Sequence, residues 1–341
     1  MLSGFGLRSQ QFSSTYISRF PRRLVSRFQS TSSASTNQSE PDHRIGTIVG
    51  EVDLDYFRKV AWVPQRPLIL QAFHNLPAIQ KWFRHDANKQ HPAFSHYMNA
   101  YENTIFPYEF NIPTKDVLAE FLAWLEESSE YNASCMPVLV EAMVQSWPHK
   151  AELSFQQFDS PLHLIMSACH FNQTRHDPNS CIKNLYIAQS SLNDLPVPLS
   201  RDLPVPDIVM HAGKGHVYNS SIWLGLQPTY TPLHRDPNPN LFCQLVNSKK
   251  IRLMTPDRGD DIYAYVRRKL GSQGNSRFRG PEMMKGQERE LLHDAVWNDG
   301  SIDEVHLHPG DALFIPLGWW HSVASYEIEG KLNASVNWWF R

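Results

Sequence analysis

Short apolar runs separated by turn-forming residues dominate the chain from residue 184 to its end. The runs are only a few residues long and are bounded by Pro, Gly, Asn or Asp. Many short strands with frequent turns are typical of a β-sandwich or barrel, so residues 184–341 are predicted to be a mainly β core. The predicted strands are Leu185–Ala188, Ser221–Leu226, Leu241–Leu245, Ile251–Thr255, Val305–Leu307, Ala312–Pro316, Ser322–Ser325 and Ala334–Phe340.

The preceding region, residues 45–183, mixes helical and strand-like patterns. Lys115–Glu130 carries apolar residues at helical spacing, and Thr114 precedes it as a candidate N-cap. This region is therefore predicted to be mixed α/β, with helices that pack on the β core. The other expected elements are strands within Ile45–Val52 and Pro64–Phe73, short helices over Asp55–Val60 and Leu76–Phe83, and a mixed segment over Ser154–Cys169.

A polar stretch of mixed charge, residues 257–300, interrupts the predicted strands. It is rich in Arg, Asp, Gly and Gln and lacks the short apolar runs on either side of it. Two interpretations are equally open: an insertion on the rim of the core, or a disordered surface loop.

The first 39 residues differ in composition from the rest of the chain. They contain five Arg and no Asp, Glu or Lys, with frequent Ser and Thr, and the first acidic residue is Glu40. This composition is typical of an organellar transit peptide, and the dominance of arginine favours the mitochondrion, with the matrix as destination. The alternative is a disordered basic tail.

Charge and composition limit the classes of partner. Without the five N-terminal arginines, 27 basic residues face 34 acidic ones, a net charge of −7. Such a body has no general attraction for phosphate backbones, so nucleic acid is not the expected partner. The longest apolar stretches are too short to span a bilayer. The four cysteines form no CxxC pair, which argues against a disulfide framework or a zinc site.

Candidate chemistry begins with the triplet His234-Arg-Asp236. Residues two apart on a strand point to the same side, so these two side chains can occupy two positions of one metal. His321, which follows a Pro-Gly-Asp turn and a short apolar strand, is the candidate third ligand. Two histidines and one carboxylate form the facial triad of non-haem Fe(II) oxygenases. A His-x-Asp triplet is weak by itself, although His234 begins the only one among the 16 histidines.

The neighbouring motifs resemble those of the jumonji-C (JmjC) oxygenases, members of the cupin superfamily. The resemblance covers residues 60–341 and is strongest from Asn184 to the end. Four segments carry it: Trp223–Leu226, Thr231–Leu253, Pro309–His321 and Ser335–Phe340. It implies a double-stranded β-helix (cupin-type) core and an Fe(II)- and 2-oxoglutarate-dependent dioxygenase that uses O2. Under this resemblance His234, Asp236 and His321 match the iron ligands.

The resemblance also assigns residues around 2-oxoglutarate. Lys249 matches the lysine that pairs with the distal carboxylate, and Tyr186 matches a tyrosine that hydrogen-bonds to the same group. Thr231 and Asn240 match polar groups around the co-substrate, and Asn337 matches a pocket asparagine near the metal. A carboxylate in a mostly apolar barrel needs such a cation and hydrogen bonds to offset its desolvation. Lys249 is therefore expected to face inward, although a solvent-facing Lys249 is the alternative.

Within the family, an Asp ligand is typical of the small protein hydroxylases, whereas many histone lysine demethylases have Glu at that place. The resemblance thus implies hydroxylation of a protein side chain. Some of these hydroxylases dimerise through C-terminal helices, and no such dimer is expected here because the chain ends at Arg341, directly after the last predicted strand. The alternatives are oxidation of a modified tRNA base, a methyl-lysine or a small metabolite, and a non-catalytic cupin-like binding module.

Overall fold

The computed structural model describes residues 45–84, 92–111, 114–146, 155–271 and 286–341. The predicted transit segment, residues 1–39, lies outside the described residues. Residues 44–341 form one compact unit. None of the helices in the described part of the chain has the length and apolarity needed to cross a membrane.

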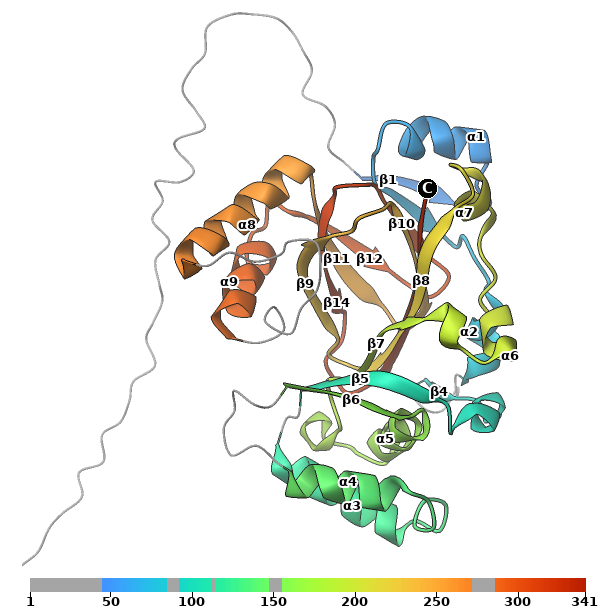
Figure 1. Cartoon of the computed structure of the whole chain (residues 1–341), viewed down its shortest axis with the longest axis vertical. Helices are drawn as coiled ribbons and strands as arrows, with labels where there is room; N and C mark the ends of the chain where they lie inside the picture. Colours follow the sequence, from blue (N-terminus) through green and yellow to red (C-terminus); the bar gives the residue numbers. More distant parts are fainter. Residues whose placement is uncertain (1–44, 85–91, 112–113, 147–154, 272–285) are drawn as a thin grey trace, which may run out of the picture. The chain divides into compact units, whose positions relative to one another are not determined.

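Eight consecutive strands form a double-stranded β-helix, which confirms the predicted fold class (Figure 1). The major sheet contains the sequence β8-β15-β10-β13, and the minor sheet has the order β9-β14-β11-β12. The chain therefore passes back and forth between two facing sheets, which is the winding of a cupin. The strands are β8 Val217–Leu226, β9 Tyr230–Arg235, β10 Asn240–Val246, β11 Lys249–Met254, β12 Asp303–Leu307, β13 Ala312–Ile315, β14 Trp320–Ser325 and β15 Leu332–Phe340.

Seven of the eight strands of this core correspond to apolar runs predicted from the sequence, whereas β9 was not among the predicted strands. Side chains that alternate between the two faces of the strands fill the interior. Phe242, Ile251 and Val323, from three different strands, meet in one buried cluster between the sheets. In β15 every residue is buried, because one face of the strand packs inside the barrel and the other against helices of the N-terminal region.

The N-terminal region packs on the major sheet and also adds strands to both of its edges. β2 pairs with β13, and β1 pairs with β2. At the other end β5 pairs with β7 and β6 with β5, so the sheet has nine strands. The elements of this region are β1 Gly46–Val49, α1 Leu54–Phe57, a π-helical turn Arg58–Trp62, β2 Leu68–Gln71, α2 Pro77–Trp82, β3 Phe83–Arg84, β4 Ala93–Phe94, β5 Ile105–Asn111, α3 Lys115–Glu127, α4 Met136–Gln145, β6 Phe155–Pro161 and α5 His163–Gln173. Between this region and β8 lie β7 Leu185–Ser191, α6 Val197–Arg201 and α7 Asp207–His211.

The helix predicted over Lys115–Glu130 is α3, and its start follows from a local contact. Thr114 is the N-cap, and its hydroxyl accepts a hydrogen bond from the Val117 N–H at 3.4 Å. This bond satisfies one of the amide groups that a helix N-terminus leaves without an intrahelical partner. The buried face of α3 consists of Val117, Leu118, Phe121 and Leu125, the apolar residues recognised in the sequence.

The polar stretch over residues 257–300 contains two helices, α8 Pro256–Leu270 and α9 Gly286–Trp297; residues 272–285 lie outside the described part. Neither expectation for this stretch included helices. The helices lie beside the minor sheet (Figure 1), and α8 contacts β11 and β14 while α9 contacts β9. Their buried residues form a second core with Trp320 of β14: Ile262, Tyr263, Val266, Leu292 and Val296.

Candidate metal centre

Two neighbouring strands of the minor sheet bring the predicted ligands together. His234 lies near the end of β9, Asp236 follows that strand, and His321 lies in β14, directly opposite His234 in the strand register. The Nε2 atom of His234 is 3.8 Å from Asp236 Oδ1, and that of His321 is 3.6 Å from Asp236 Oδ2. Ligand atoms of all three residues lie within 4.8 Å of one another.

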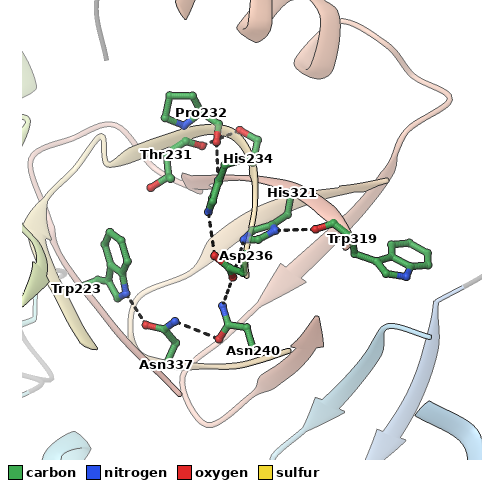
Figure 2. Close-up of polar contacts among 10 residues, drawn as sticks. Trp223, Thr231, Pro232, His234, Asp236, Asn240, Trp319, His321 and Asn337 are labelled. Carbon is green, nitrogen blue, oxygen red and sulfur yellow. Dashed lines mark hydrogen bonds and ion pairs between the residues drawn. The ribbon is translucent and has the colours of Figure 1, made fainter. Parts of the chain in front are cut away.

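Both imidazole rings are held with the same nitrogen facing the centre (Figure 2). The Nδ1 atom of His234 lies 2.8 Å from the Pro232 carbonyl oxygen, and that of His321 lies 3.4 Å from the Trp319 carbonyl oxygen. A carbonyl oxygen can only accept, so Nδ1 carries the proton and donates in each ring. Nε2 is then left as a lone-pair donor, which is the tautomer that a metal requires.

The protonation state of His321 also suits metal binding. Burial and, to a smaller extent, the nearby His234 lower the pKa of His321 to about 4, against the opposing effect of Asp236. The ring is therefore neutral at neutral pH. A metal competes with protons for the same lone pair, so a neutral ring binds more readily.

The donor set fits a divalent transition metal of the non-haem iron type. Two imidazole nitrogens and one carboxylate converge from one side, which leaves the remaining coordination positions open toward the pocket. Among the described residues this is the one cluster of His, Cys, Asp and Glu whose ligand atoms come this close. His234, Asp236 and His321 are the residues that would hold the ion.

The residues predicted to bind the distal carboxylate of the co-substrate, Lys249 and Tyr186, line the same cavity. The Lys249 side chain is buried, with its Nζ 2.8 Å from Ser335 Oγ and 3.4 Å from the Tyr186 hydroxyl. Lys250 points to the other side of β11, where its Nζ lies 5.3 Å from the centre of the Tyr326 ring. The structure thus places Lys249, and not its neighbour, inside the barrel.

All eight predicted site residues surround one cavity, which we call the inner pocket. Sequence reasoning gave no role in it to three further lining residues, Trp223, Phe242 and Val323, whereas Trp339 is one of the tryptophans expected to wall the site. Trp223 stood within a recognised motif, but its contact with the site depends on strand pairing that no local pattern reveals. The inner pocket is lined by Tyr186, Trp223, Thr231, His234, Asp236, Asn240, Phe242, Lys249, His321, Val323, Asn337 and Trp339.

The two asparagines link the metal ligand to the wall of the pocket. Asn240 donates to Asp236 Oδ2 at 2.9 Å, and Asn337 donates to Asn240 Oδ1 at 3.1 Å (Figure 2). Their side chains meet because β10 and β15 pair directly, and both are almost fully buried. Asn240 therefore contacts the candidate ligand Asp236 directly, and Asn337 contacts Asn240.

Helix α8 braces the strands that carry the ligands. Arg235, between two ligands, forms an ion pair with Asp260 of α8 at 3.1 Å, and its guanidinium lies 5.1 Å from the centre of the Trp320 ring. Trp320 precedes the third ligand and packs against Gly259 of the same helix, where an added Cβ would lie 2.1 Å from the ring. A glycine is required there because the indole occupies the space of a side chain.

Comparison with known proteins agrees with this fold. The model of the family described as "Cupin-like domain" matches residues 55–341. The chain is 32% identical to "Lysine-specific demethylase 8" of Danio rerio over 157 residues, which is 46% of this chain and 36% of that protein. It is 29% identical to "Lysine-specific demethylase JMJ30" of Arabidopsis thaliana over 180 residues, 52% of this chain and 38% of that protein.

A third relative is "Jumonji C domain-containing protein 5" of Drosophila melanogaster, 30% identical over 152 residues, 44% of this chain and 36% of that protein. Each alignment thus covers little more than a third of the relative's length. The family match, in contrast, includes nearly all of the described residues and the whole of the inner pocket. The chain belongs to the cupin-like JmjC family.

Proposed function

We propose that this chain is an Fe(II)- and 2-oxoglutarate-dependent oxygenase that hydroxylates a side chain of a protein substrate. The observation that carries the proposal is the pairing of two sites in one cavity. A facial triad opens onto the inner pocket, and a buried lysine lies at the deep end of the same pocket. This arrangement suits a dicarboxylate that reaches from the metal to Lys249.

The residues of the chain would divide the work between binding and orientation. His234, Asp236 and His321 would hold Fe(II), which when bound supplies the reduction of O2 coupled to oxidation of 2-oxoglutarate and of a substrate C–H bond. Lys249 and Tyr186 would bind the distal carboxylate of the co-substrate, at the depth where Ser335 also contacts the lysine. The aromatic walls would exclude water from the reacting atoms.

A second candidate, removal of a methyl group from lysine, is favoured by the names of two relatives, both called lysine-specific demethylases. The same oxidation applied to an N-methyl carbon gives a hydroxymethyl amine that releases formaldehyde. The two functions therefore share the metal and the co-substrate and differ only in the substrate atom that reaches the metal. The reaction products distinguish hydroxylation from demethylation.

The experiment compares protein extracts of cells that lack the gene after treatment with the wild type or with His234→Ala. The extracts receive Fe(II), 2-oxoglutarate and isotopically labelled dioxygen, and their peptides are analysed by mass spectrometry. A labelled oxygen atom on a side chain, present only with the wild type, supports hydroxylation. Loss of methyl groups with release of formaldehyde supports demethylation. If no peptide changes and no substrate-dependent succinate forms, both the hydroxylase and the demethylase function are refuted. The remaining alternative is then a non-catalytic binding module.

We also propose that residues 1–39 direct the protein to mitochondria, on the strength of their arginine-rich, acid-free composition. A fluorescent reporter fused to this segment should enter mitochondria. Replacement of Arg19, Arg22, Arg23 and Arg27 by Glu should keep the reporter in the cytosol. A native segment that leaves the reporter in the cytosol would refute the proposal.

A further inference from the structure

A continuous series of hydrogen bonds runs from the wall of the inner pocket to the carboxylate ligand. Trp223 Nε1 donates to Asn337 Oδ1 at 2.7 Å, and Asn337 Nδ2 donates to Asn240 Oδ1 at 3.1 Å. Asn240 Nδ2 then donates to Asp236 Oδ2 at 2.9 Å. Figure 2 shows the three bonds in succession, and we call these four residues the amide relay.

The direction of the relay follows from the chemistry of its two ends. The indole N–H of Trp223 can only donate, and an ionised Asp236 carboxylate can only accept. Each asparagine between them offers one donor and one acceptor side. Only one orientation of the two amides satisfies every member. If either amide were turned over, two acceptors or two donors would face each other in a buried site.

Strand pairing and burial make the relay rigid. Asn337 lies opposite Phe242 of β10 and Ser221 of β8, so three adjacent strands fix its position. Trp223, at the start of the relay, has 8% of its surface exposed, and its ring centre lies 6.0 Å from that of Tyr186. The side chain that sets the direction is thus itself held by packing.

We propose that Trp223 is a positioning residue of the metal centre, acting through Asn337 and Asn240. The indole N–H fixes the orientation of the Asn337 and Asn240 amides. The Asn240 NH2 group then faces Asp236, and its hydrogen bond holds the carboxylate in the orientation that binds the metal. This inference rests on the proposed function, because it presumes that His234, Asp236 and His321 hold a divalent ion. Partners one step removed from a metal ligand commonly change metal affinity by about 10–100-fold.

The test is anaerobic titration of the full chain with Co(II), a spectroscopic substitute for Fe(II). Trp223→Phe keeps an aromatic ring against Tyr186 but removes the donor, and should weaken Co(II) binding about 10–100-fold. It should also alter the visible absorption of the saturated protein, because the carboxylate is no longer held in one posture. Loss of stability alone would not change that spectrum.

Two further variants test the route and the specificity of the effect. Asn337→Leu interrupts the relay in its middle and should weaken Co(II) binding to a similar degree, and Trp223→Phe added to it should cause no further loss. Trp338→Phe is the matched control, because this buried tryptophan adjoins Asn337 yet its Nε1 has no hydrogen-bond partner among the described residues. The control should bind Co(II) as the wild type does.

The outcomes separate the inference from the function on which it rests. Wild-type affinity and spectrum in Trp223→Phe would overturn the relay, as would additive losses in the double variant, which would indicate packing alone. If Trp223→Phe does not fold, Asn337→Leu decides the matter by the same two measurements. A wild-type chain that binds neither Co(II) nor Fe(II) would instead overturn the proposed function itself.

Discussion

Replacing Lys249 by methionine should separate the binding of 2-oxoglutarate from the folding of the barrel. The methionine has a similar length and keeps the packing near the Phe242 ring, whose centre lies 5.3 Å from the lysine Nζ. It removes a fully buried charge that lies 2.8 Å from Ser335 Oγ and 3.4 Å from the Tyr186 hydroxyl. The distal carboxylate of the co-substrate would then lose its cation but keep both hydroxyl groups.

The size of the effect follows from this partial loss. Removing one partner of a buried, hydrogen-bonded charge pair costs about 2–5 kcal/mol. Because Ser335 and Tyr186 remain as donors, we expect a value of about 3 kcal/mol, which corresponds to a roughly 150-fold increase in the Kd of 2-oxoglutarate. The ligand-free melting temperature should change little or rise, because replacing a buried charge by an apolar group is often neutral or stabilising.

The assay is calorimetric titration of 2-oxoglutarate into protein loaded with Mn(II), which prevents turnover. Lys250→Met is the control, since Lys250 lies on the other side of β11 near Tyr326. Equal affinities of the wild type and Lys249→Met for 2-oxoglutarate would refute the assignment of Lys249 as the partner of the distal carboxylate. A large loss in Lys250→Met alone would mean that the strand register is shifted by one residue.

Three other perturbations have definite expected outcomes. His234→Ala should abolish turnover and reduce bound iron, measured by elemental analysis, while the circular dichroism spectrum stays that of the wild type; full activity would contradict the ligand assignment. Gly259→Ala should lower stability by about 1–3 kcal/mol in thermal unfolding, because its Cβ would lie 2.1 Å from the Trp320 ring, and an unchanged melting temperature would show that α8 is loosely docked. Burial lowers the pKa of His74 from 6.5 in the unfolded chain to about 4 in the folded chain. Between pH 6.5 and 4 the unfolded chain therefore binds more protons than the folded chain, and the free energy of unfolding falls as the pH drops. In His74→Gln, chemical denaturation should show a fall in the free energy of unfolding over this pH range that is smaller by up to about 3 kcal/mol. An identical pH dependence in the variant and the wild type would contradict the role of His74.

Much of the β core was predictable from the sequence because each strand is marked by a pattern within a few consecutive residues. Short apolar runs between turns mark strands wherever both faces of a sheet are covered, and β15 illustrates this with nine buried residues. The convergence of the candidate metal ligands was predictable for a similar reason. The His234 and Asp236 spacing places both side chains on one side of a strand, and the motif around His321 marks the candidate third ligand.

The features that were not predicted depend on contacts between distant segments. Helix α8 carries so many charges, among them Arg267 and Arg268, that its buried stripe of Ile262, Tyr263 and Val266 is hard to recognise in the sequence. That stripe is explained only by Trp320, which it covers. The hydrogen bond from Trp223 to Asn337 likewise exists only because β8 and β15 pair in one register, and no spacing along the chain encodes it.

The nine-stranded sheet has a consequence for any attempt to isolate the catalytic core. A fragment that began at residue 184 would lose β2 from beside β13 and β5 from beside β7, and so would expose unpaired N–H and C=O groups at two places. Open sheet edges of this kind are templates for aggregation between chains. The N-terminal strands therefore cover the edges of β13 and β7, and a soluble fragment would have to retain residues 45–183 even though the three candidate metal ligands lie outside them.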